Sequence, residues 1–116
     1  MTGSSSTAPP PGDREAGQTY ARLIKSRNRV APRNRADVHR QLARLAAHLY
    51  PLFPSLAAGH HLDAAESLAN FGLWEAALDE ADKAELLAYE DCGAGEHLLE
   101  RAKELYREAA AKGVKR

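Results

Sequence analysis

The chain has 116 residues, with 16 Lys and Arg against 16 Asp and Glu, so its formal net charge is zero. This length closes one small domain, and the charge balance argues against a globally charged binder of nucleic acid or membrane surfaces. The longest apolar run is four residues, from Leu86 to Tyr89, whereas a membrane-spanning helix needs about twenty. With no signal-like start and a single cysteine, Cys92, we expect a cytoplasmic protein.

The apolar residues of this chain are mainly helix formers. The sequence contains 23 Ala and 15 Leu, and Val38 is the only β-branched residue between positions 31 and 113. Ala and Leu favour helices, whereas a half-buried sheet is built from β-branched and aromatic side chains. The composition therefore predicts an all-α fold, a small bundle of four to five helices.

Three regions follow one another along the chain. Residues 1–18 hold a Ser run, a Pro run and three Gly, and we expect them to form a disordered tail. Residues 19–36 are expected to be a basic arm or short helix, in which Tyr20, Leu23 and Ile24 stand at helical spacing. Residues 37–116 are expected to be the helical domain, whose first helix ends before Pro51 because proline lacks a backbone donor.

Two further helices are expected to form an antiparallel hairpin. The first carries apolar residues at positions 62, 65, 68 and 69, and the second begins at Trp74 and carries Ala at positions 77, 81, 84 and 88, with Gly72 between them. Small side chains let two helices approach closely. A last helix is expected from Glu96 to Lys112, with Gly113 as its C-cap. The aromatic side chains expected in the core are Phe71, Trp74 and Tyr106.

The segment from Gly72 to Ala84 resembles the second helix of a tetratricopeptide (TPR) unit. That family has a Gly in the turn, an aromatic residue two positions later and two small residues beyond it, as Gly72, Trp74, Ala77 and Ala84 are placed here. The match covers about half of one repeat, and no second unit follows at the family's period. The resemblance implies a TPR-like helical hairpin and not a tandem array. Three positions of the preceding helix depart from the family pattern: His61, Ala65 and Leu68.

A second likeness concerns the order of the elements between residues 55 and 113. It is similar to that of small helical immunity proteins, which protect bacteria against their own nuclease toxins. Those families characteristically have an acidic second helix in the hairpin, where Glu75, Asp79 and Asp82 stand here. The likeness implies an alternative function, in which this chain neutralises a bacterial nuclease by mimicking the phosphates that the toxin binds.

The zero net charge conceals a segregation of charge along the chain. Residues 1–44 carry a net charge of +6 and residues 45–116 one of −6, and Lys83 is the only basic residue among eleven acids between positions 63 and 100. Such an anionic surface speeds encounter with a cationic partner. The alternative is that these acids only solvate a helix face. The candidate partner-binding residues are Glu66, Glu75, Asp79, Asp82 and Glu85.

The Arg-rich segment 22–44 is a second candidate site, with Asp37 as its only acid. Guanidinium groups suit phosphates, so the segment predicts an alternative role in nucleic-acid binding, against which stand the acidic remainder and the scarcity of aromatic residues. A third interpretation lays this arm on the acidic hairpin, in the same molecule or in a neighbour, which allows a homodimer. The candidate nucleic-acid-binding residues are Arg22, Lys25, Arg27, Arg29, Arg33 and Arg35.

The sequence contains no motif for catalysis, for a cofactor or for a metal. The pairs His60 with Asp63 and Cys92 with His97 fall short of the three or four ligands that a zinc site needs. We therefore expect a non-enzymatic protein-protein interaction module that presents an acidic helical face to a basic protein partner.

Overall fold

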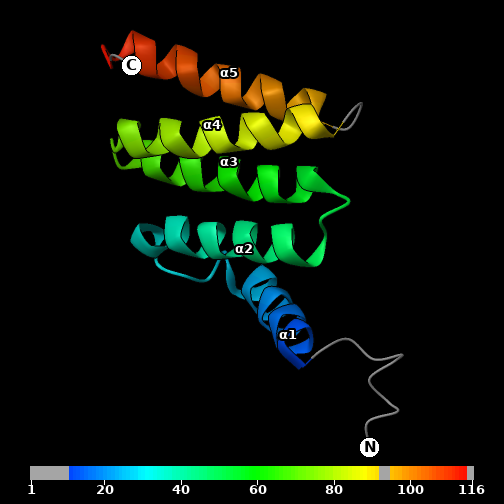
Figure 1. Ribbon diagram of the computed structural model, residues 1–116. Helices are drawn as coiled ribbons and strands as arrows, with labels where there is room; N and C mark the ends of the chain where they lie inside the picture. Colours follow the sequence, from blue (N-terminus) through cyan, green and yellow to red (C-terminus); the bar gives the residue numbers. More distant parts are fainter. Residues whose placement is uncertain (1–10, 92–94, 115–116) are drawn as a thin grey trace, which may run out of the picture.

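The computed structural model describes residues 11–91 and 95–114, and these ranges contain helices and no strand. Successive helices from α2 to α5 run antiparallel and are stacked side by side, with α1 crossing below α2 (Figure 1). The predicted all-α fold is therefore confirmed. The elements are α1 Pro11–Ser26, the 3-10 helix η2 Pro32–Asn34, α2 Arg35–Leu49, α3 Pro54–Asn70, α4 Trp74–Glu90 and α5 Glu96–Ala111.

The helix α1 begins earlier than the sequence indicates. The first ten residues of the expected 1–18 tail lie outside the described residues, but residues 11–18 form the first half of α1, so that part of the expectation is wrong. Pro11 suits the first position of a helix, and Asp13 in the first turn favours the helix dipole. A contact of 2.6 Å between the Asp13 carboxylate and His48 Nε2 ties this half of α1 to the end of α2.

The segment 19–36, expected to be a basic arm or short helix, is divided between the end of α1, η2 and the first two residues of α2. Tyr20, Leu23 and Ile24 lie on the second half of α1 and are all partly buried. A turn follows, and then η2. The apolar residues of the arm therefore attach it to the helical domain as a regular helix.

Gly72 and Gly113 end helices in the same way. Each has a positive φ, of 74° and 80°, which suits a residue without a side chain. The amide of Gly72 donates a hydrogen bond to the carbonyl of Ala69, and the amide of Leu73 donates one to the carbonyl of Leu68. Gly113 and Val114 repeat this pair of bonds at the end of α5. This pair of hydrogen bonds closes each helix as a Schellman motif. It confirms the expected turn at Gly72 and the expected cap at Gly113.

The core lies mainly between α3, α4 and α5 and is built largely from alanine, and Leu42 and Ala43 of α2 are also fully buried. Leu62 is fully buried on α3, and buried alanines surround it on α3 and α4. Trp74 is 9% exposed and belongs to this core, as expected. Phe71 was expected there too, but it lies in the α3–α4 turn and is 52% exposed, because the C-cap directs the chain away from the core at that point. Tyr106 is partly buried at the edge of the core.

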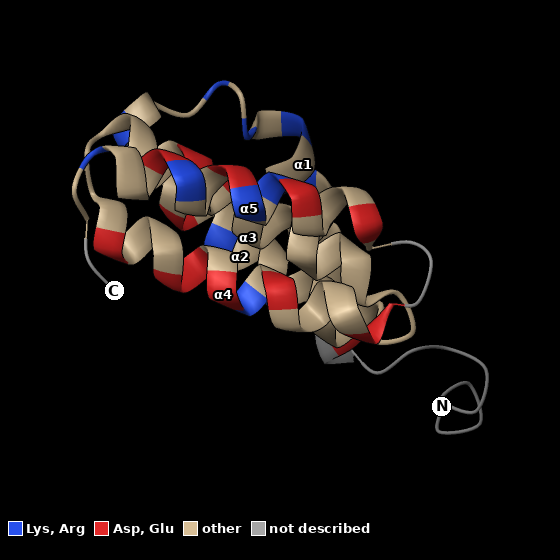
Figure 2. Cartoon of the chain, turned by 90° about the horizontal axis from the view of Figure 1, so that it is seen from above, with Lys and Arg blue, Asp and Glu red and all other residues tan. Residues whose placement is uncertain are grey.

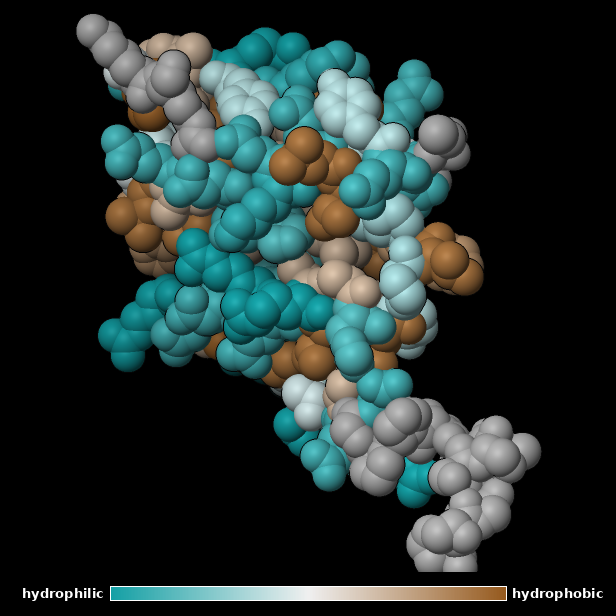
Figure 3. Space-filling view, in the orientation of Figure 1, coloured by the Kyte–Doolittle hydropathy of each residue, from teal (hydrophilic) through white to brown (hydrophobic). Residues whose placement is uncertain are grey.

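Large apolar side chains are also exposed at the connection between α2 and α3. Leu52 is 85% exposed and Phe53 59% exposed. In Figure 3 hydrophobic atoms project at the end of the molecule where this connection lies. Within the described ranges, no helix has both the length and the apolar composition needed to span a membrane.

Candidate functional site

The predicted acidic face of α4 is present and reaches along the whole helix. Glu75 and Asp79 are exposed, Asp82 is partly buried, and Glu90 near the end of the helix is exposed. These positions follow one another at intervals of four, three and eight residues, so they lie on one side of the helix. In Figure 2 acidic positions recur along α4, in which Lys83 is the only basic residue, whereas α5 carries several residues of each sign.

Two of the five predicted acids also take part in the contact between α4 and α5. The Tyr106 hydroxyl of α5 donates its hydrogen bond to the Asp82 carboxylate, and Glu85 Oε1 lies 3.4 Å from the same hydroxyl oxygen. Burial raises the pKa of Tyr106, and the hydrogen bond to Asp82 and the charge of Glu85 raise it further, so the phenol stays protonated. Asp82 and Glu85 therefore support the packing of α5 in addition to charging the surface.

Glu66 belongs to a different part of the surface. It lies on α3, where its Oε1 accepts a hydrogen bond of 2.8 Å from Arg101 of α5, while Asp63 accepts one of 3.0 Å from the same guanidinium. Arg101 and Tyr106 are five residues apart, which turns them about 140° from one another around α5. The structure therefore brings Glu75, Asp79 and Asp82 together and separates Glu66 from them.

The predicted basic residues also fall into separate groups. Arg22, Lys25 and Arg29 are exposed and line one hollow on the outer side of α1. Arg27 lies on the inner side, beside α3 and α5. Arg35 donates hydrogen bonds to the carbonyls of Val30 at 3.1 Å and Asn28 at 3.2 Å, and so closes the connection between α1 and α2. Arg33 is exposed in η2.

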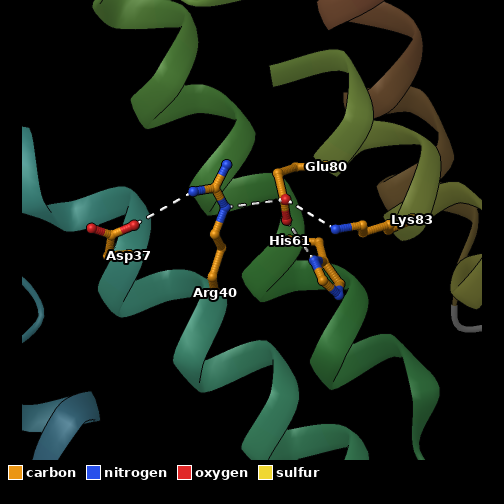
Figure 4. A network of polar contacts seen from close by, with 5 residues as sticks. All are labelled: Asp37, Arg40, His61, Glu80 and Lys83. Carbon is orange, nitrogen blue, oxygen red and sulfur yellow. Dashed lines mark hydrogen bonds and ion pairs between the residues drawn. The ribbon is translucent and has the colours of Figure 1, made fainter. Parts of the chain in front are cut away.

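A buried carboxylate at the centre of the bundle was not predicted. Glu80 of α4 is 2% exposed and receives contacts from two other helices (Figure 4). His61 Nδ1 of α3 lies 2.8 Å from its Oε1, and Arg40 Nε of α2 lies 3.2 Å from its Oε2. Lys83 Nζ, one turn along α4, lies 3.3 Å from Oε2. Asp37 extends the network at its exposed edge with a contact of 3.4 Å to Arg40.

The electrostatics of Glu80 show why this charge is tolerated inside the fold. Burial alone would raise its pKa, but the hydrogen bond from His61 and the charges of Lys83 and Arg40 outweigh it and lower the pKa from 4.5 to about 2. A periodic signal for this position exists in the sequence, since Glu80 stands three residues after the buried Ala77 and four before the buried Ala84. Helical phase therefore places it on the packing stripe.

A second unpredicted feature is a groove of about 630 Å³ that α1, α3 and α5 share. Its lining includes Ile24 of α1, Leu56 of α3 and Leu98 of α5. His60 of α3 is 6% exposed, and its Nε2 shares a hydrogen bond of 2.8 Å with the Tyr20 hydroxyl. Burial lowers the pKa of His60 to about 4, so this imidazole is neutral at physiological pH. The Tyr20–His60 bond attaches α1 to the rest of the bundle.

Within the described part of the chain, no group of three or more His, Cys, Asp and Glu residues is arranged to hold a metal ion. Cys92, which the sequence sets near His97, lies outside the described residues. Neither a protein-family model, nor a curated protein, nor a solved structure matches this chain.

Proposed function

We propose that this protein is a non-enzymatic helical interaction module and that the outer face of α4 binds a basic surface of another protein. The observation that carries this proposal is the acidic stripe of α4, Glu75, Asp79, Asp82 and Glu90, which spans the helix. A predominantly negative field along a helix accelerates association with a positive surface and disfavours a polyanion.

Two exposed apolar side chains lie beside the acidic stripe and can anchor a bound partner. Leu86 is 69% exposed and Tyr89 64% exposed, and both lie between Asp82 and Glu90 in the chain. Interfaces combine charges that steer association with a few large apolar or aromatic anchors that supply binding energy. The contacts of Glu80 with α2 and α3 hold α4 in place, so its outer face is presented on a rigid support.

Reversing two charges of the stripe is expected to weaken partner capture. The double variant Glu75→Lys and Asp79→Lys places two cations where the basic partner docks, and it should weaken binding by about tenfold or more, roughly 1.4 kcal/mol. Helicity should be unchanged because both residues are exposed. The measurement is affinity capture from an extract of the source organism, in which captured proteins and their isoelectric points are identified by mass spectrometry.

A matched control uses the same change of charge on α5. Glu100 and Glu104 are exposed, and among the described residues their ion pairs are local ones within α5, with Lys103 and Arg107. The double variant Glu100→Lys and Glu104→Lys should therefore retain the partners of the wild type. If the α4 variant retains them as well, the acidic face is not the binding site.

A second candidate function is binding of nucleic acid by α1. It is favoured by the exposure of Arg22 and Lys25 on α1 and of Arg29 in the turn after it, which line one hollow and have no ion pair within the described part of the chain. Three phosphate contacts predict that log K for duplex DNA falls against log salt with a slope of about −3. A filter-binding titration measures this slope, and Arg22→Glu with Lys25→Glu should abolish binding. A flat response to salt would exclude this role.

A further inference from the structure

The outer side of α1 carries a stripe of basic residues. Its members are all exposed, and they stand 0, 8, 11 and 15 residues after Arg14: Arg14, Arg22, Lys25 and Arg29. Gln18, Arg22, Lys25 and Arg29 line the same surface hollow, so the stripe continues past the end of the helix at Ser26. No intramolecular ion pair to these four cations occurs among the described residues.

The acidic stripe of α4 has the same spacing when it is followed in the opposite direction. From Glu90 the acids stand 0, 8, 11 and 15 residues away, at Glu90, Asp82, Asp79 and Glu75. The first three cations lie on α1 and the four acids on α4, and both helices rise by about 1.5 Å per residue, so equal residue spacings between these residues are equal distances. An antiparallel alignment therefore sets Arg14, Arg22 and Lys25 each opposite an acid, and the same count along the chain continues to Arg29 in the turn after α1. The four facing pairs are Arg14 with Glu90, Arg22 with Asp82, Lys25 with Asp79 and Arg29 with Glu75.

A parallel alignment does not produce this match. Counted forwards from Glu75, the acids stand at 0, 4, 7 and 15, which leaves Asp79 and Asp82 without a facing cation and Arg22 and Lys25 without a facing acid. Gln18 is the uncharged member of the α1 stripe, and in the antiparallel alignment it stands opposite the exposed, apolar Leu86. The aliphatic stem of Arg22, one turn further along α1, can cover Leu86 as well.

The two stripes do not meet within one molecule. The helix α1 contacts α2 and reaches α3 through the Tyr20–His60 bond, whereas α4 packs on α3 and α5. In Figure 1 α2 and α3 lie between α1 and α4. The complement of the α1 stripe is therefore the α4 stripe of another molecule of the same chain, and the net charge of zero means that copies do not repel one another.

We infer that α1 of one copy docks antiparallel on the outer face of α4 of a second copy, through these four ion pairs and Leu86. The inference rests on the proposed function of the α4 face and names its partner. Exposed ion pairs are individually weak and are screened by salt. Self-association is therefore expected at low ionic strength and should diminish as salt is added.

A charge-swap experiment tests this contact with nuclease-treated, full-length protein in sedimentation velocity. Arg22→Glu with Lys25→Glu reverses the α1 stripe, and Glu75→Lys with Asp79→Lys reverses the α4 stripe. Each variant alone sets like charges against one another, and its self-association should weaken by about tenfold or more. A mixture of the two variants restores opposite charges and should recover association, whereas Glu100→Lys with Glu104→Lys should behave as the wild type.

The result distinguishes this inference from the proposed function. A monomeric wild type at low salt, or a mixture that stays monomeric, overturns self-association while partner capture by α4 still stands on its own test. Self-association that persists in the α4 variant, or that is lost on nuclease treatment, also overturns the contact. In the second case the α1 stripe binds nucleic acid.

Cross-linking tests the register itself. With Cys92 replaced by Ser, a Lys25→Cys copy mixed with an Asp79→Cys copy should give a dimer with a short bifunctional maleimide. The mismatched mixture of Lys25→Cys with Glu90→Cys keeps the same chemistry but separates the thiols by about 16 Å along the helices, for 11 residues. Equal yields from the two mixtures would contradict the antiparallel register.

Discussion

Replacing Leu62 by Ala is expected to lower the free energy of unfolding by about 4 kcal/mol, in the upper part of the range for core substitutions. Leu62 is fully buried, and the residues around it in the core are mainly alanines, including Ala58, Ala65, Ala77 and Ala81. Leu→Ala costs about 2–5 kcal/mol, and the cost rises with the cavity that stays open. Alanine side chains have no rotamers with which to fill that cavity, so the upper part of the range applies.

The measurement is urea denaturation followed by far-UV circular dichroism. Small domains have a total stability of about 5–15 kcal/mol, so the variant should unfold at a much lower urea concentration. Leu52→Ala is the matched control, because Leu52 is 85% exposed and its truncation should change stability by less than about 0.5 kcal/mol. Similar losses for the two variants would show that Leu62 is not at the centre of the core.

The limits of the helices could largely be predicted from the sequence, because local chemistry sets them. Pro51 follows the end of α2, Gly72 makes the left-handed turn after α3, and Gly113 closes α5. The helix α1 begins earlier than the sequence pattern predicts. Its first half is polar and rich in Gly and Pro, and the contact that ties it down, Asp13 with His48, joins residues 35 positions apart. The sequence pattern of the first 18 residues does not show that His48 is the partner of Asp13.

The candidate site illustrates the same limit for charge. The acidic stripe of α4 follows from helical periodicity within one segment, and the structure keeps Glu75, Asp79 and Asp82 together. The separation of Glu66 depends on Arg101, 35 residues away, and the contact of Asp82 depends on Tyr106, 24 residues away. Net charge over a segment does not tell which acids meet a cation across the fold.

Glu80 is the acid whose contacts with cations of other helices stabilise the fold most. Glu80→Ala is expected to destabilise the fold by about 3 kcal/mol, because it removes the shared acceptor of His61, Arg40 and Lys83. Chemical denaturation at pH 7 measures the loss. The control is Asp37→Ala at the exposed edge of the same network, where the contact with Arg40 should contribute less than about 1 kcal/mol.

The pH dependence of this loss separates the charge of Glu80 from its packing. The pKa of Glu80 is about 2 in the folded protein against an ordinary value of 4.5, so the folded state binds the proton less tightly than the unfolded state does. Its stabilisation is therefore complete above about pH 4.5 and is lost as the pH falls towards 2. Glu80→Gln keeps the size and an acceptor oxygen but has no proton to gain in this range. The difference in unfolding free energy between the wild type and Glu80→Gln should accordingly shrink between pH 4.5 and 2, whereas a constant difference would mean that Glu80 acts through its shape alone.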